Sequence, residues 1–207
     1  ILSALYNRKT SKIGSKIDIS MLDCQIAILE NAIARYTVLK DNPIPLGTDH
    51  PSITPFGSFK TLDEKIVIAA GNDKIFNKLC DLISRSDLYK NKLFNNNLNR
   101  SNNINALRYE IEKSLELKKS NYWIKIFRMS GIPCSKINKI SEVLKNPQLI
   151  ERNMFLDYVE SLNHKFKVSG NPIKIDGIKE SHIARKAPSL NQDKKKILKF
   201  FGINLNN

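Results

Sequence analysis

The segment from residue 41 to residue 57 limits most strongly what this chain can fold into. Four prolines and two glycines lie within it. Each proline lacks an amide donor and restricts the residue before it, so neither a helix nor a central strand can run through the segment. The sequence therefore predicts a domain boundary at Asp41–Pro45, followed by a turn-rich, shaped loop from Gly47 to Gly57.

The residues before this boundary have mainly helical character. Ile1–Tyr6 reads as part of a helix, and the missing N-cap signal and initiator Met predict that this helix begins upstream. Ser15–Ile19 alternates polar and apolar residues, which predicts a short strand. Ser20 stands three residues before Asp23, the spacing of a helix cap, and apolar residues then repeat at helical intervals. We therefore expect one helix from Ser20 to about Leu39.

The residues after the loop alternate between strand and helix patterns. Two short strands joined by a tight turn at Leu62–Glu64 come first. Helical spacing then begins, with Asp73 as the expected N-cap, and Trp123 falls on an apolar stripe that predicts a core position. The expected elements are strands at 58–61, 65–70 and 155–168, helices from 73, at 104–115, 123–131, 141–147 and 192–201, and an Asn-rich connector at 91–105.

The balance of charge is strongly basic. The chain has 34 Lys and Arg against 20 Asp and Glu, a net charge of +14. Such an excess favours a polyanionic partner. The lysines are scattered, however, and the cluster Lys194–Lys196 is too short for an interaction tail. Lys, Asn and Ile are overused together, which indicates compositional drift on a solvated surface. Nucleic-acid binding is therefore the weakest functional hypothesis.

The cysteines and the apolar residues indicate the compartment. Cys24, Cys80 and Cys134 are far apart and form no paired motif, which predicts reduced, buried thiols with neither a disulfide framework nor a zinc site. No apolar run approaches the ~20 residues of a membrane span, and the N-terminus lacks the pattern of a signal peptide. We expect a soluble, cytoplasmic protein that uses no metal and contacts no membrane.

Five segments of the chain carry a family resemblance. They are RKTSKIGSKIDISMLD at Arg8–Asp23, GTDHPSITPFGSFKTLDEKIVIAAGND at Gly47–Asp73, GIPCSKINKISEVLKNPQL at Gly131–Leu149, GNPIKI at 170–175 and APSLNQ at 187–192. In content and in order they resemble the C-terminal half of the family III CoA-transferases, the CaiB/BaiF type. Ser11 and Lys12 depart from the first signature, where the family has Thr and Gly.

The resemblance implies an α/β fold of two domains in which the N-terminal half is absent. Residues 1–46 would be the end of the large α/β domain and a linker helix. Residues 47–168 would form a small α+β domain, and residues 169–207 would return to the large domain. The family also implies an interlocked homodimer, or here a complementing N-terminal half as partner.

The chemistry that the resemblance implies is the transfer of CoA between an acyl-CoA and a carboxylic acid, with coenzyme A as co-substrate and no metal. In the family an aspartate attacks the thioester, giving a mixed anhydride and then an aspartyl-CoA thioester. That aspartate lies before the Arg8 segment, and Asp18 and Asp23 belong to the signature that follows it. We therefore expect no catalytic residue in this chain and no activity without the N-terminal half. The alternatives are a racemase of the same family and a non-enzymatic remnant or binding module that keeps the fold.

The residues expected to bind substrate are Asp49, His50, Ser52 and Phe56, all in the 47–57 loop. His50 titrates near neutrality and can contact an acyl carboxylate. The competing interpretation is that Asp49 and His50 only organise the turn through local hydrogen bonds. In the family this loop covers the active site of the formyl-CoA branch. Here its glycine run is missing, and Phe56 replaces a common Tyr and its hydroxyl.

Overall fold

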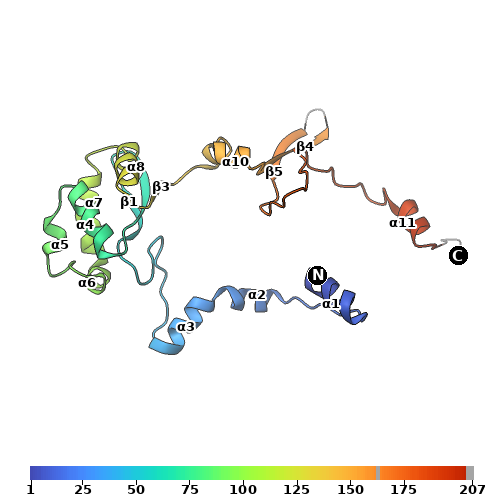
Figure 1. The fold of residues 1–207 in the computed structure, drawn as a ribbon, viewed down its shortest axis with the longest axis horizontal. Coiled ribbons are helices and arrows are strands. Elements are labelled where there is room, and N and C mark those ends of the chain that lie inside the picture. Colours follow the sequence, from blue (N-terminus) through green and yellow to red (C-terminus); the bar gives the residue numbers. More distant parts are fainter. Residues whose placement is uncertain (162–163, 204–207) are drawn as a thin grey trace.

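The structure, a computed structural model, describes residues 1–161 and 164–203. Figure 1 shows a compact group of helices and strands from which two arms extend toward the same side. We call residues 54–136 the core domain, residues 1–46 the N-terminal arm and residues 137–203 the C-terminal arm. Among the described residues, every buried one lies between Thr54 and Ile132. The hydrophobic effect therefore stabilises the core domain, while the arms hold apolar side chains in solvent.

A three-stranded antiparallel sheet forms one side of the core domain. Its strands are β1 (Phe56–Lys60), β2 (Lys65–Ala69) and β3 (Cys134–Lys136), in the order β1-β2-β3. The predicted hairpin of β1 and β2 is confirmed, with Phe59 opposite Ile66. Strand β3 was not predicted, because three residues after a helix show no alternation that could be recognised.

Five helices of the core domain pack beside this sheet, with α7 and α8 in direct contact with its strands. They are α4 (Asp73–Leu82), α5 (Asp87–Lys90), α6 (Asn97–Asn102), α7 (Ile104–Leu115) and α8 (Ser120–Met129). Two expectations were wrong in detail. Asn72 caps α4, not Asp73, because the Asn72 side chain accepts from the Ile75 amide at 2.9 Å. The Asn-rich connector contains α6, which Asn96 caps by accepting from the Asn99 amide at 2.8 Å.

The core is a single apolar cluster between the sheet and these helices. Trp123 belongs to it as predicted, stacks on Phe127 at 5.6 Å between ring centroids and donates from Nε1 to the Leu115 carbonyl at 2.7 Å. Its indole N–H is therefore satisfied inside the core. The other large members of the cluster are Phe59, Ile66, Ile68, Phe76, Leu79, Ile83, Leu88, Phe94, Leu107, Ile111, Leu115, Ile124 and Ile132.

Among the residues that the structure describes, one charged side chain, Arg100 of α6, is completely buried. Its guanidinium donates to the Thr54 carbonyl at 2.7 Å, to the Phe94 carbonyl at 3.2 Å and to Asp73 Oδ1 at 2.7 Å. It also lies 4.5 Å above the Phe76 ring. A buried guanidinium is tolerated only when its donors are paired, and here Arg100 of α6 links Thr54 of the loop before β1, Phe94 and Asp73 of α4.

The N-terminal arm consists of α1 (Leu2–Ser11), α2 (Met21–Ile28) and α3 (Glu30–Leu39). None of the three helices has a buried residue. The strand predicted at 15–19 was wrong, because no other strand in the described residues lies beside it to accept its hydrogen bonds. The expected single helix is divided at Leu29. Cys24 was predicted to be buried and is exposed, whereas Cys80 is buried as predicted.

The C-terminal arm begins with α9 (Ile140–Val143) and α10 (Pro147–Glu151). The strand predicted at 155–168 is a two-stranded hairpin of β4 (Phe155–Ser161) and β5 (His164–Ser169), with Tyr158 opposite Phe166. The final helix, α11 (Lys194–Phe200), confirms the prediction at 192–201. Among the described helices, none is long and apolar enough to cross a membrane.

Candidate functional site

The 47–57 loop runs back along β1 and is bonded to it at two points. The His50 amide donates to the Phe56 carbonyl at 2.9 Å. Thr48 Oγ1 accepts from the Ser58 amide at 3.0 Å and lies 2.9 Å from Ser58 Oγ. Asp49 stands between these two attachments. The loop is therefore a shaped structure with its own hydrogen bonds, as its turn residues predicted.

Helix α6 holds the far end of the loop. Asn97 Nδ2 donates to the Ser52 carbonyl at 2.8 Å, and Asn97 Oδ1 accepts from the Thr54 amide at 3.0 Å. Arg100 bonds the Thr54 carbonyl from the same helix. Both polar groups of the Thr54 backbone are thus paired by side chains of α6, which fixes where the loop enters β1.

Asp49 forms an ion pair with Arg108 of α7. Arg108 Nη2 donates to Asp49 Oδ1, and Nη1 donates to the Ser58 carbonyl. The guanidinium lies 4.6 Å above the Phe59 ring, and Glu112 Oε1 is 3.9 Å from Nη1. The interpretation in which Asp49 organises the turn only through local bonds was wrong, because its partner lies 59 residues further along the chain.

Gly57 makes this ion pair possible. A Cβ atom at this position would lie 2.2 Å from Asp49 Oδ1 and 3.2 Å from the Thr48 carbonyl oxygen. No side chain fits at such distances without displacing the Asp49 carboxylate. The glycine is therefore required by the close approach of the loop to β1.

His50 does make the expected local bond. Its Nδ1 accepts from the Ser52 amide at 3.2 Å, and its ring stacks on Phe56 with 5.3 Å between centroids. Since Nδ1 is the acceptor, the neutral imidazole carries its proton on Nε2. Within the described residues no group bonds Nε2. The loop thus brings His50, Ser52 and Phe56 together and presents one N–H donor beside an aromatic ring that is 37% exposed.

No room for a ligand exists beneath the loop. The recess between the loop and α7, lined by Asp49, Pro55, Phe56, Phe59 and Leu107, is too narrow for a water molecule. The loop therefore rests on packed side chains, and its open side is the accessible one. In the described part of the chain, no three His, Cys, Asp or Glu side chains gather where they could hold a metal ion.

Sequence reasoning missed Arg108, which organises the loop from outside it. The available signal was the pair Arg108 and Glu112, four residues apart on the predicted helix at 104–115. Nothing in the sequence connected that pair with Asp49. Asp18 and Asp23, the signature aspartates, are exposed on the N-terminal arm.

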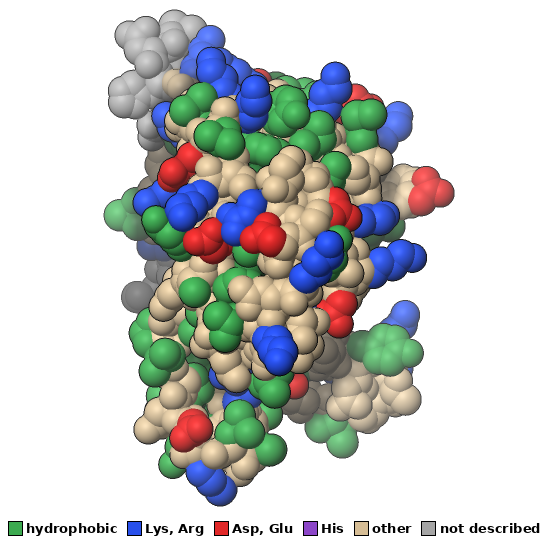
Figure 2. Space-filling view, turned by 90° about the vertical axis from the view of Figure 1, so that its left-hand side faces the viewer, with side chains coloured by type: hydrophobic (Ala, Val, Ile, Leu, Met, Phe, Trp, Pro, Cys, Tyr) green, Lys and Arg blue, Asp and Glu red, His purple; other side chains and the backbone are tan. Residues whose placement is uncertain are grey.

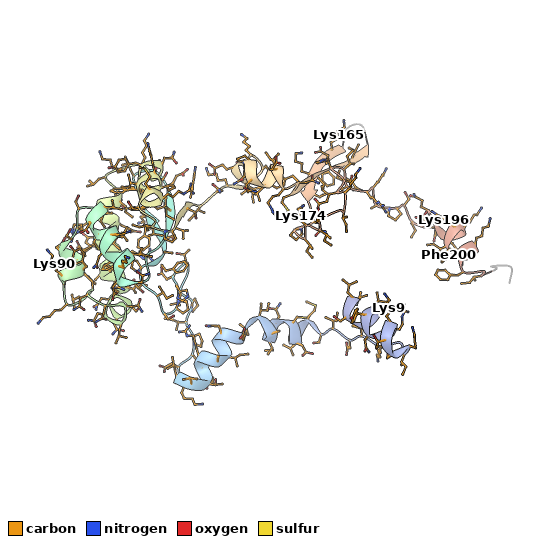
Figure 3. The ribbon with its side chains drawn as sticks, in the orientation of Figure 1. Lys9, Lys90, Lys165, Lys174, Lys196 and Phe200 are labelled. Carbon is orange, nitrogen blue, oxygen red and sulfur yellow. The ribbon has the colours of Figure 1, made fainter. Side chains whose placement is uncertain are left out.

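The positive charge is distributed over the molecule. Figure 2 shows the outer side of the core domain, where Lys and Arg side chains alternate with Asp and Glu and with hydrophobic side chains. Figure 3 labels lysines on four separate elements: Lys9 on α1, Lys90 on α5, Lys165 on β5 and Lys196 on α11. This mixed surface does not single out one basic face.

The chain is similar to a large group of CoA-transferases. The model of CoA-transferase family III matches residues 1–194. The chain is 32% identical to the acetyl-CoA:oxalate CoA-transferase of Acetobacter aceti, over 93% of the chain and 48% of that protein. It is 29% identical to the human succinyl-CoA:glutarate CoA-transferase, over 96% of the chain and 45% of that protein.

Solved structures agree with these relatives. The crystal structure of a CaiB/BaiF family protein from Brucella suis superposes with a TM-score of 0.77 at 28% identity, over 96% of the chain and 51% of that protein. The chain spans about half the length of the relatives it matches. The predicted fold class is confirmed: the chain mixes helices and strands as the CaiB/BaiF structures do, over about half of each.

Proposed function

Because the chain belongs to CoA-transferase family III, we propose that it is the C-terminal part of an enzyme that moves CoA from an acyl-CoA to a carboxylic acid. The observation that carries this proposal is a family match over residues 1–194 in a chain that covers only about half of each relative. Coenzyme A is then a co-substrate, and no metal takes part.

In this proposal the 47–57 loop contributes to binding of the substrate. The Nε2–H of His50 donates to an oxygen of the acyl or carboxylate group, and Ser52 holds the ring in the tautomer that allows this. Phe56 stacks on the His50 ring and offers apolar contact to the acyl chain. Asp49 does not contact the substrate in this proposal, because its carboxylate is paired with Arg108; it fixes the position of the loop.

The nucleophilic aspartate is supplied by an N-terminal half, so this chain alone has no catalytic residue and no activity. The exposed apolar side chains of both arms support such a partner. In the N-terminal arm they include Leu22, Ile26 and Leu29; in the C-terminal arm they include Ile173, Ile183 and Phe201. Surfaces of this kind are normally covered by protein. We propose that the N-terminal half and a second copy of the chain cover them in a cytoplasmic, interlocked homodimer.

The domain division belongs to the same proposal. Residues 1–46 and 169–207 would complete the large domain of the assembled enzyme, and residues 47–168 would form the small one. The concentration of buried residues between Thr54 and Ile132 supports a small domain that folds around its own core.

The test is reconstitution. The chain is mixed with a separately produced N-terminal half from the same gene region, and the mixture is incubated with acetyl-CoA or succinyl-CoA and with oxalate or glutarate, the acids named for the relatives. We expect a stable complex, CoA transfer detected by mass spectrometry, and a hydroxylamine-trapped adduct on an aspartate of the N-terminal half.

A complex that forms but shows no CoA-dependent adduct would replace the enzyme by the non-enzymatic module that keeps the fold. Exchange of the proton next to the thioester carbonyl with solvent deuterium, without transfer, would favour the racemase branch. Both outcomes would overturn the proposed transferase.

A further inference from the structure

Arg108 contacts the 47–57 loop and β1 at once, although it belongs to α7. One guanidinium nitrogen donates to Asp49 and another to the Ser58 carbonyl, while the plane of the group lies above Phe59. The side chain of Arg108 is 23% exposed and that of Asp49 is 20% exposed. Two bonds from one planar group fix both the distance and the angle between the loop and the strand.

The loop bonds beside this ion pair are weaker and neutral. Thr48 is attached by its hydroxyl to Ser58, and His50 is attached by its amide to the Phe56 carbonyl. Asp49 lies between them, pressed against Gly57, where there is no space for a Cβ atom. We therefore expect the charge-assisted bond of Arg108 to Asp49, which is the strongest of the three, to keep the neutral bonds of Thr48 and His50 formed.

The geometry points to Arg108 as the positioning residue of the site: it holds Asp49 against Gly57 and thereby keeps His50 in the ring orientation and tautomer that present Nε2–H to a substrate oxygen. The chain of contacts is continuous. Arg108 bonds the Asp49 carboxylate. His50, the next residue, donates its backbone amide to the Phe56 carbonyl, and its ring stacks on the Phe56 ring. The Ser52 amide then donates to Nδ1 of His50. The part of this inference that concerns a substrate oxygen rests on the proposed function. The effect of Arg108 on the His50 ring can be measured in the chain by itself.

The experiment measures the His50 ring in the 207-residue chain without acyl-CoA or an N-terminal half. Long-range proton–nitrogen NMR spectra at pH 8 distinguish a protonated Nε2 from a protonated Nδ1. The chain has three histidines, and the signal that disappears in His50→Gln is the one to follow. We expect the wild-type chain to show Nε2–H with Nδ1 as acceptor.

The substitution Arg108→Gln should convert this signal to an average of the two tautomers. The His50 amide should also exchange with solvent about tenfold faster, because its bond to Phe56 opens more often. Arg108→Lys should restore part of both, since an ammonium pairs with Asp49 but cannot bond Ser58 in the same fixed geometry. Ile66 and Ile68 amides, in the core strand β2, report whether each variant is folded.

Arg85→Gln is the matched control. Arg85 also bonds a residue of α7, Glu110 at 2.7 Å, but its other partner is Asp87 and it does not touch the loop. We expect its His50 signal to match the wild type. If Arg108→Gln does not fold, Asp49→Asn breaks the same ion pair from the loop side with little change of shape.

An unchanged His50 tautomer and amide exchange rate in Arg108→Gln, or in Asp49→Asn where the first variant does not fold, would overturn the positioning role. Because no CoA transfer is measured here, failure of the reconstituted enzyme would refute the proposed function and leave this result standing. Conversely, a reconstituted enzyme that transfers CoA while Arg108→Gln leaves His50 unchanged would support the proposed function and refute the positioning role.

Discussion

Replacing Arg100 by methionine should remove much of the stability of the core domain. The side chain is 0% exposed and its guanidinium bonds two carbonyl oxygens, those of Thr54 and Phe94, in residues that are themselves buried. Methionine has a similar length and fills the space above Phe76, so the substitution removes the hydrogen bonds with little loss of volume.

The magnitude follows from what is left unpaired. Each buried carbonyl that loses its donor costs about 1–3 kcal/mol. The Asp73 carboxylate adds little, because its side chain is 62% exposed and water can replace the guanidinium. Relief of the buried charge offsets part of the loss. We therefore expect Arg100→Met to lower the free energy of unfolding by about 3 kcal/mol.

Urea unfolding followed by Trp123 fluorescence measures this change. Trp123 is the only tryptophan of the chain and is buried in the core domain, so its emission reports that domain alone. With a slope of about 1.5 kcal/mol/M, the midpoint should fall by about 2 M. The control, Asp73→Asn, should change the midpoint by about 0.5 M or less.

Two results would contradict the expected loss of stability. A midpoint for Arg100→Met within about 0.5 M of the wild type would mean that the two carbonyls find other donors or water. An equal loss in Asp73→Asn would mean that the ion pair, and not the carbonyl bonds, stabilises the domain.

Three further predictions concern the thiols, the arms and acid stability. Cys24 should react with iodoacetamide at pH 8 within minutes while Cys80 reacts only on unfolding, because burial raises the pKa of Cys80 to about 12; equal labelling by mass spectrometry would contradict this. Amides of the N-terminal arm should exchange faster than those of the core-domain strands in the isolated chain, and the opposite order would show that the arm is covered. The hydrogen bond from Lys136 holds the pKa of Glu142 below its ordinary value of 4.5. The stability that the Glu142 carboxylate contributes is therefore complete above pH 4.5 and is lost as the pH falls through the lowered pKa. Glu142→Gln should make the free energy of unfolding less dependent on pH in this acid range, and an unchanged pH dependence would contradict the prediction.

The sequence predicted most elements of the core domain because their side-chain periods are regular. The β1–β2 hairpin, α7, α8 and the core position of Trp123 were all recognisable from local patterns. The Asn-rich connector hid α6, since its helix depends on caps and on Arg100 reaching distant carbonyls. Long-range pairing of this kind leaves no periodic signal.

In the N-terminal arm, a regular local pattern predicted an element that the structure does not form. Alternation at 15–19 predicted a strand, but a strand needs a neighbour, and the described residues supply none. In the candidate site, the turn residues predicted the loop and local hydrogen bonding at His50, but not the ion pair of Asp49 with Arg108. A contact across 59 residues is set by the packing of α7 on β1, which local composition does not encode.

The bonds that attach the 47–57 loop and α7 to β1 also close the edge of the sheet. Along that edge, Phe56 O, Ser58 N, Ser58 O and Lys60 N are paired by His50, Thr48, Arg108 and Glu112. An edge strand whose polar groups are taken cannot serve as a template for another strand. On the other side of the sheet, β3 is only three residues long. Self-association of the isolated chain should therefore proceed through the apolar arms, and trimming the arms should leave a core domain that stays monomeric.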